Sequence, residues 1–520
     1  MRSTRHASRV AETLGASPTC HTSLFTRTLV LFLLVFLWAA PARALVSTER
    51  DGITLTYPAG EEAIAHRVIM AAPLIMNFLA SRGLSVTLPL EILLDDTLDV
   101  PRVFAHMIPH REIRIPLRAP GVLEEGFLEE DPWVYFLFMG LCRQGIYALR
   151  GGIPEAAHAL FGEVISPNLV NPPWVIDGVG HLLYTSYRGH PRVHPLDAAY
   201  LASGVPRDMA RVSNHPGIWP GYFGYRIYGR PFIGFLHERF GWEGIRAFLL
   251  SQGSGIIPLE IDLKARATFG SSWATLWNEF ITISGLSHAA DDGTLISGYV
   301  TGPVVTWDNS GVYPGPKLVR HRGRYGYRDE RGILWLSEYD ADGISQLVGY
   351  TRQGLAFSCD TEHIWDPGQG NVAVTRFGST PALIIFQMER TLFGRHCLSS
   401  TTIPAPPGAL QLSGPVMNEA GQIAVSANTL GNWDIWVYDG SWSRITSEES
   451  VDMDPFWEGE TLVFSSNRTG TFQVHTADLT LLSTCPYAGV LPRQGFFLCL
   501  EPTGWATREI VTHAARITPH

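Results

Sequence analysis

Residues 131–149 read DPWVYFLFMGLCRQGIYAL and residues 172–187 read PPWVIDGVGHLLYTSY, and both stretches predict helices. In the first stretch Asp131 is a suitable N-cap and Pro132 suits the first helical position, whereas the Gly151–Gly152 pair should end the helix. The prolines that open the second stretch mark a helix start in the same way. We expect these two apolar helices to organise the first part of the chain.

Shorter elements on both sides of these helices predict an α+β domain over residues 45–285. Apolar or alternating runs predict strands at 52–57, 88–94, 103–107 and 112–117. Apolar residues at helical spacing predict further helices at 61–82, 154–161, 196–203, 222–239, 242–251, 259–269 and 273–284. The predicted domain is therefore a small sheet beside a helical portion.

Near Gly285 the sequence changes character, and residues 286–520 predict a second, all-β domain. Short aromatic-rich strands alternate there with glycine and aspartate, and no long helical period remains. Residues 414–426 (GPVMNEAGQIAVS) align with 454–465 (DPFWEGETLVFS), and 428–438 align with 467–476. A repeat of about 40 residues corresponds to one four-stranded propeller blade. The predicted fold class is thus multidomain α+β, with an α+β domain followed by a propeller-like domain.

The two opening helices resemble the zinc-binding helices of gluzincin-type, peptidase MA-like domains. The segment Trp174-Val175-Ile176-Asp177-Gly178 is similar to the W-x-x-E-G of that family. Downstream, Tyr228-Gly229-Arg230-Pro231-Phe232 is similar to its Y-G-x-x-F helix. The resemblance covers about residues 52–284 and depends on the order and spacing of these motifs. It implies a zincin-like fold for the first domain.

The residues that would hold zinc and activate water are mostly replaced. Such a site needs two histidines one helical turn apart with a glutamate beside the first, and the chain contains no H-E-x-x-H. The apolar pattern places Phe138 and Cys142 where the histidines would stand, and Met139 where the base would stand. Asp177 takes the place of the third ligand. We therefore expect no catalytic residue, no bound metal and no cofactor, and the resemblance implies a degenerate peptidase.

A second interpretation of this region retains a metal site. Cys142, Asp177 and His181 offer ligand types that zinc accepts, and Asp177 and His181 are four residues apart on one predicted helix. An atypical zinc hydrolase is therefore the alternative function, although Met139 cannot accept a proton as the family's glutamate does.

Several other polar residues could act in catalysis by their chemistry, but each has a simpler structural explanation. Glu129 and Glu130 are expected at a solvated helix entry, and are poor substitutes for the missing base. Tyr225 or Tyr228 matches the family's oxyanion-stabilising tyrosine, but core packing explains either one. His190, His194 and His215 fall in a loop-rich stretch and are expected at the surface.

The second domain resembles TolB-type propellers. That family carries D-x-x-P-x-W followed by F-S-S-N-R-x-G. Residues 452–457 (DMDPFW) and 464–470 (FSSNRTG) match this signature. Asn467 also begins a formal glycosylation sequon, but its place in the repeat's turn favours a structural role.

The N-terminus and the cysteines indicate an oxidising compartment. Residues 1–44 combine a basic flank, an apolar run at 28–40 and an A-x-A end, which is the pattern of a secretory signal peptide. No later apolar segment is expected to be long enough to span a membrane. Two disulfides are plausible, Cys485 with Cys499 and Cys359 with Cys397, although simple burial of these thiols is an equal alternative.

Charge narrows the class of partner. The whole chain carries −10, and residues 1–44 hold five arginines against one glutamate, so the mature chain is near −14. Nucleic acid and anionic lipid select basic patches and are not expected partners. The predicted function is a periplasmic or secreted bacterial protein that binds protein, peptide or envelope ligands without catalysis. The sequence leaves the oligomeric state open.

Overall fold

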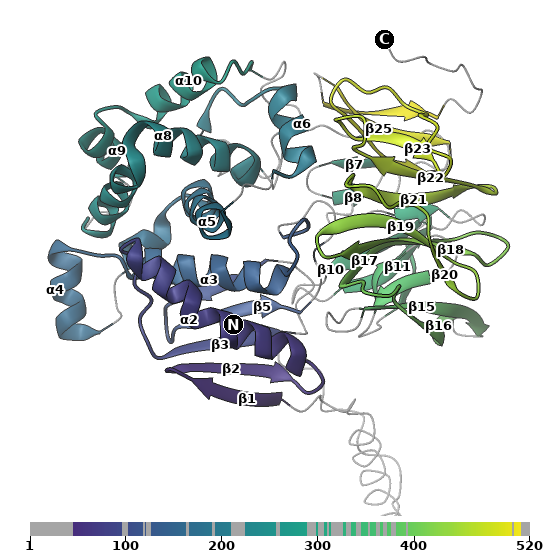
Figure 1. Ribbon diagram of the computed structural model, residues 1–520, viewed down its shortest axis with the longest axis horizontal. Helices are drawn as coiled ribbons and strands as arrows, with labels where there is room; N and C mark the ends of the chain where they lie inside the picture. Colours follow the sequence, from purple (N-terminus) through teal and green to yellow (C-terminus); the bar gives the residue numbers. More distant parts are fainter. Residues whose placement is uncertain are drawn as a thin grey trace, which may run out of the picture. The chain divides into compact units, whose positions relative to one another are not determined.

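The computed structural model is a mixed α+β chain with helices and several separate sheets (Figure 1). Val46–His520 forms one compact unit, separate from Met1–Leu45. Up to residue 288 the structure describes 45–95, 102–117, 120, 126–162, 166–189, 193–209, 224–255 and 260–288. Beyond that it describes the backbone of the strands from 298 to 375, then 381–391, 394–493, 495–501 and 504–510. The predicted signal peptide lies outside the described residues.

The first part contains one five-stranded sheet in the order β1-β2-β3-β5-β4. Its strands are β1 (Leu45–Arg50), β2 (Ile53–Pro58), β3 (Leu90–Asp95), β4 (Phe104–His106) and β5 (Glu112–Pro116). β3 pairs in parallel with both β2 and β5, whereas β4 runs antiparallel to β5. Asp51 and Gly52 both have positive φ between β1 and β2, as the two central residues of a type I′ hairpin turn require.

Two long helices lie next to this sheet. α2 (Glu62–Ser81) continues through Pro73, and its buried side chains contact β2 and α3. By length and composition α2 is the one helix in the described part of the chain that could cross a membrane, which the sequence analysis did not expect. Core helices pass the same test, and the buried face of α2 packs in the hydrophobic core.

α3 (Pro132–Ala148) begins where the sequence predicted. An oxygen of Asp131 accepts hydrogen bonds from the backbone N–H groups of Trp133 and Val134, and Arg67 donates to the other oxygen. A Cβ on Gly140 would lie 2.6 Å from Cγ2 of Ile113, so the glycine lets α3 approach β5 closely. The N-cap and this glycine thus fix where α3 begins and how it lies on the sheet.

The remaining helices follow the predicted order. They are α4 (Gly152–Phe161), the short 3₁₀ helix η1 (Pro167–Val170), α5 (Pro173–Arg188), α6 (Pro195–Ser203), α8 (Gly224–Gly253), α9 (Ile261–Phe269) and α10 (Trp273–Ile283). α8 is broken at Gly241, where φ is 67°, in agreement with the two predicted helices. α5 and α8 pack closely, because a Cβ on Gly229 would lie 2.7 Å from Cβ of Trp174.

After α10 the described residues form strands grouped in six small antiparallel sheets. Their strands are β6–β8 (Gly298–Tyr299, Thr306–Asp308, Gly311–Tyr313), β9–β12 (Gly326–Arg328, Leu334–Tyr339, Ser345–Thr351, Gly354–Cys359), β13–β16 (Ile364–Pro367, Val372–Thr375, Ala382–Thr391, Gly394–Pro404), β17–β20 (Gln411–Met417, Ile423–Thr429, Asn432–Tyr438, Trp442–Arg444), β21–β23 (Asp452–Glu458, Thr461–Ser466, Gln473–Thr476) and β24–β26 (Ala488–Arg493, Phe496–Glu501, Gly504–Glu509). The first strands β13, β17, β21 and β24 contact one another in turn. β26 of the last sheet contacts β6 of the first.

The internal repeat seen in the sequence is present in the backbone. Gly414 and Asp454, which the repeat aligns, both have positive φ, at 60° and 52°. Both lie in a β-bulge of the first strand of their sheet. A register shift also occurs next to Pro367 on β13 and Pro492 on β24. Proline lacks an N–H group, so a bulge is where a strand tolerates it.

Residues of the two sequence motifs at 452–457 and 464–470 contact one another and their neighbours through buried hydrogen bonds. Arg468 donates to both carboxylate oxygens of Asp452, each at 3.1 Å. The Asn467 side-chain oxygen accepts the backbone N–H of Val451 at 2.8 Å, which is the structural role expected for this turn.

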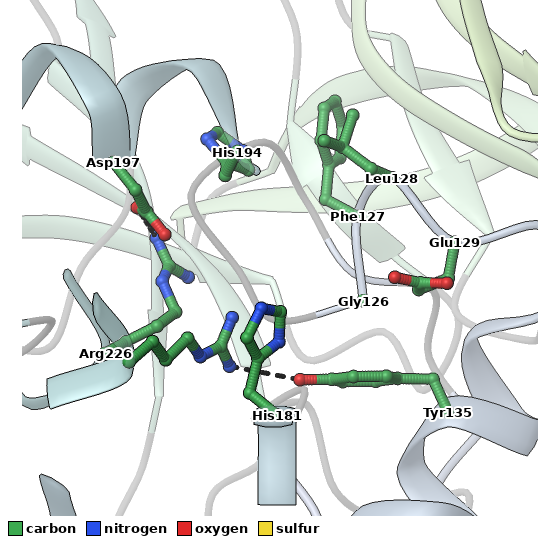
Figure 2. A pocket seen from close by; sticks show the side chains of 10 residues that line it. Gly126, Phe127, Leu128, Glu129, Tyr135, His181, His194, Asp197 and Arg226 are labelled. Atoms are coloured by element: carbon green, nitrogen blue, oxygen red, sulfur yellow. Dashed lines mark hydrogen bonds and ion pairs between the residues drawn. The ribbon is translucent and has the colours of Figure 1, made fainter. Parts of the chain in front are cut away.

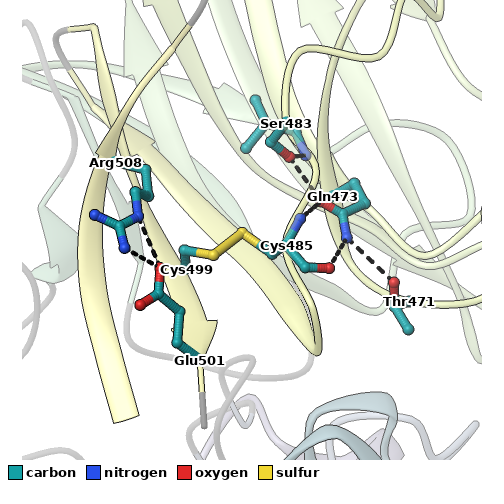
Figure 3. Close-up of a disulfide and its surroundings, with 8 residues drawn as sticks. Thr471, Gln473, Ser483, Cys485, Cys499, Glu501 and Arg508 are labelled. Carbon is teal, nitrogen blue, oxygen red and sulfur yellow. Dashed lines mark hydrogen bonds and ion pairs between the residues drawn. A yellow bond between two sulfur atoms is a disulfide. The ribbon is translucent and has the colours of Figure 1, made fainter. Parts of the chain in front are cut away.

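One of the two predicted disulfides is described. Cys485 and Cys499 form a disulfide, and Gln473 accepts the backbone N–H of Cys485 beside it (Figure 3). Cys359 lies on β12 and Cys397 on β16, but their side chains are outside the described part of the structure.

Candidate functional site

The three α3 residues at the predicted metal-site positions are fully buried. The ring of Phe138 lies among Phe78 of α2 and Tyr184 and Tyr187 of α5, with centroids 6.0, 5.2 and 5.4 Å away. Met139 lies against α5, since a Cβ on Gly180 would come within 2.8 Å of its Cε. Phe138 and Met139 therefore fill the space between α2, α3 and α5 with apolar atoms.

Cys142 is also inside the core and is the free cysteine among the described residues. Burial raises the pKa of its thiol to about 12, against a smaller lowering by the charge of Arg143. The thiol is therefore protonated at neutral pH, and zinc could bind it only by displacing this proton inside an apolar core.

Asp177 is held by an arginine that the sequence analysis quoted but gave no role. Arg230 of α8 donates from Nε to Oδ2 of Asp177 at 2.8 Å and from Nη2 to Oδ1 at 3.2 Å. The same Nη2 donates to the Tyr135 hydroxyl at 3.1 Å. The carboxylate is 1% exposed. At the position predicted for the third ligand, both carboxylate oxygens thus accept a hydrogen bond from a guanidinium.

His181 lies one turn after Asp177 on α5 and is half-buried. Within the described ranges, the trio of possible ligands whose ligand atoms lie within 4.8 Å of one another is Glu91, His110 and Glu112 on the edge of the sheet. Cys142, Asp177 and His181 do not form such a trio.

A pocket lies next to the Asp177–Arg230 pair (Figure 2). The space between its lining atoms is about 350 Å³ when the open solvent at its mouth is included. Its lining comes from the loop before α3, from α3 and α5, and from α6 and α8: Gly126, Phe127, Leu128, Glu129, Tyr135, His181, His194, Asp197, Arg226 and Arg230. Polar and charged side chains make up most of this wall, which suits binding of a polar ligand.

One side of the pocket holds a second buried ion pair. Arg226 of α8 donates to Oδ1 of Asp197 on α6 at 2.7 Å, and both side chains are almost fully buried. Burial raises the pKa of Asp197, but the charge of Arg226 and the hydrogen bond that it donates lower the pKa, which lies below its usual value. Asp197 therefore stays ionised and balances the charge of Arg226.

His194 contradicts its predicted surface position. It is 9% exposed, and its Nδ1 accepts the backbone N–H of Leu196 at 3.2 Å, so it is the N-cap of α6. A ring nitrogen that accepts a hydrogen bond carries no proton, which fixes the tautomer of the neutral ring. His190 and His215 lie outside the described residues.

Glu129 also differs from its predicted place at a solvated helix entry. It is 9% exposed and accepts a hydrogen bond from the Tyr184 hydroxyl at 2.7 Å. Burial raises the pKa of Tyr184, and the negative charge of Glu129 raises it further. Glu130 next to it is exposed and bonds Arg188 instead. The prediction was thus wrong for Glu129 and right for Glu130.

The two tyrosines considered for oxyanion stabilisation are buried in the core. The Tyr228 hydroxyl donates to the Gly204 carbonyl at 2.9 Å, and burial raises its pKa. Tyr225 is 8% exposed. Neither residue lines the pocket.

Sequence reasoning missed three of the pocket's charged residues: Asp197, Arg226 and Arg230. The available signal was the pair of arginines four apart on an otherwise apolar segment, since a buried charge needs a partner. No protein-family model matches the chain, and no curated protein sequence matches it.

Proposed function

We propose that this protein binds a polar ligand, a peptide or a segment of a protein or envelope polymer, without catalysing its hydrolysis. The observation that carries the proposal is the Arg230–Asp177 pair. Each oxygen of Asp177 accepts a hydrogen bond from the guanidinium, and a metal cation at this carboxylate would lie next to the positive charge of Arg230. The protonated Cys142 thiol and the apolar Phe138 and Met139 support the same conclusion.

The pocket supports a binding role. It opens beside the place where the resemblance puts the peptidase cleft, and charged and aromatic side chains line it. Buried charges that are already paired and fixed in position make a preorganised polar surface, which lowers the cost of ordering on binding.

In our proposal the second domain is a propeller of six blades. Its support is the recurring proline bulge, the contact of successive first strands, and the contact of β26 with β6, which would close a ring. A propeller presents rigid loops that suit a protein partner.

We place the protein in the periplasm or outside the cell. The leader pattern of residues 1–44 and the Cys485–Cys499 disulfide support an oxidising compartment.

Incubation with a synthetic peptide mixture and added zinc tests this function. Peptides should be retained by the immobilised protein and recovered uncut, as judged by mass spectrometry. Cleavage that disappears in Asp177→Ala would instead establish the zinc hydrolase. An absence of any retained peptide would refute peptide binding.

A further inference from the structure

Among the carboxylates at the pocket, Glu129 is the one to which no described guanidinium or ammonium group donates a hydrogen bond. Its one side-chain partner among the described residues is the neutral Tyr184 hydroxyl, at Oε2. The two other acidic groups at this place, Asp177 and Asp197, each hold an arginine. Figure 2 shows Glu129 and Tyr135 on one side of the pocket and Asp197 with Arg226 on the other.

The balance of charge at the pocket is negative. Three carboxylates, Glu129, Asp177 and Asp197, face two guanidinium groups, Arg226 and Arg230, when the histidines are neutral. The next cation, Arg188, bonds Glu130, and its charge also interacts with that of Glu129. Glu130 and Arg188 together add one charge of each sign, so the balance stays negative. One negative charge therefore remains, and it resides on a side chain that is nine-tenths buried. Burying such a charge is costly unless an opposite charge meets it.

The walls beside Glu129 are aromatic. Tyr135 packs edge-on against Tyr184, with ring centroids 4.9 Å apart. Phe127 stacks on Trp433 at 4.2 Å, and Trp433 Nε1 donates to the Phe127 carbonyl at 2.7 Å. The loop that carries Glu129 is thus held in place, and aromatic faces attract cations.

We propose that this pocket binds the primary ammonium group of a peptide, with Glu129 as the acceptor. The inference rests on the proposed binding function and names the group that the pocket selects. An ammonium brings three N–H donors and one positive charge, and it meets the negative excess directly. The arginines do not oppose it, because Asp177 and Asp197 neutralise them across the pocket.

Two sources of a primary ammonium differ in a simple test. The probes are trialanine amide, its N-acetylated form, and N-acetylated Ala-Lys-Ala amide, with binding followed by ligand-observed NMR on the full chain. If the pocket selects a terminal amine, only the first probe should bind. If the pocket selects the amine of a lysine side chain, the third probe should bind and the second should not. Equal binding of the free and acetylated alanine peptides, or no binding of any probe, would overturn the proposal.

Glu129→Gln tests whether Glu129 is the acceptor of the ammonium group, and Glu130→Gln is its matched control. Glutamine keeps the size of Glu129 and can still accept from Tyr184, so Glu129→Gln should fold, as circular dichroism would verify. We expect it to bind the preferred amine about tenfold more weakly. Glu130→Gln should bind as the native protein does. An equal loss of affinity in both variants would refute the role of Glu129. If the protein retains free and N-acetylated peptides equally, the amine proposal fails but the proposed binding function still holds.

Discussion

Arg230 and Asp177 join α8 to α5 through two hydrogen bonds, 2.8 Å from Nε to Oδ2 and 3.2 Å from Nη2 to Oδ1. The sequence predicts that this carboxylate takes the place of a metal ligand, and here its counter-ion is a guanidinium of the same chain. One residue thus supplies the positive charge that a metal would otherwise bring to Asp177.

Removing Arg230 should be costly, because it leaves Asp177 charged and buried. We expect Arg230→Ala to lower the free energy of unfolding by about 3–5 kcal/mol in urea denaturation. Arg239→Ala on the same helix is the control, because Arg239 and Glu279 form an exposed pair worth about 0–1 kcal/mol. Equal losses in the two variants would show that the Arg230–Asp177 pair is not what holds α8 to α5.

The glycines of α5 should differ in their tolerance of a methyl group. A Cβ on Gly178 would lie 2.5 Å from Cγ1 of Ile233 and 3.0 Å from the backbone oxygen of Gly229. Gly178→Ala should therefore destabilise the fold by about 1–3 kcal/mol.

Gly180→Ala meets only the flexible end of Met139, which can move. Alanine also favours the helix by about 0.5–1 kcal/mol over glycine. We expect no loss of stability in thermal unfolding of Gly180→Ala. A loss as large as that of Gly178→Ala would contradict the expectation that the Met139 side chain moves aside.

Asp197 should make the free energy of unfolding depend on pH in the acid range. Its pKa in the folded protein is lower than its usual value, since the charge of Arg226 and the hydrogen bond that it donates act against the effect of burial. The carboxylate therefore stabilises the fold fully above the unfolded-state pKa, and this contribution is lost as the pH falls through the folded-state pKa.

Urea denaturation at a series of pH values below about 5 measures this loss. The free energy of unfolding should fall less steeply with acid in Asp197→Asn than in the native protein. Parallel curves would mean that Asp197 is not the group responsible.

Local signals predicted much of the fold. The N-cap Asp131, the prolines of α5 and the repeat around Gly414 and Asp454 all act over a few residues, and each appears where expected. The strand β1 was missed although Asp51–Gly52 is a hairpin signal.

The site was harder to predict because its pairs are distant in sequence. Arg230 and Asp177 are 53 residues apart, and Arg226 and Asp197 are 29 apart. The burial of Glu129 likewise depends on Tyr184, 55 residues away. Spacing along one helix cannot reveal which carboxylate meets which arginine.

A grafted metal site would test the alignment of α3 with the family. Phe138→His, Met139→Glu and Cys142→His together should create zinc affinity, measured by isothermal titration calorimetry. Adding Arg230→Gln should strengthen it, because both oxygens of Asp177 become available. No zinc uptake by the folded four-residue variant would mean that the alignment is wrong.

The metal content of the purified native chain tests the central claim most directly. Elemental analysis of protein prepared without chelators should find no stoichiometric zinc, because Arg230 occupies Asp177 and the Cys142 thiol is protonated. One zinc per chain that is lost in both Asp177→Ala and His181→Ala, with the fold intact, would contradict the account and establish a metal centre.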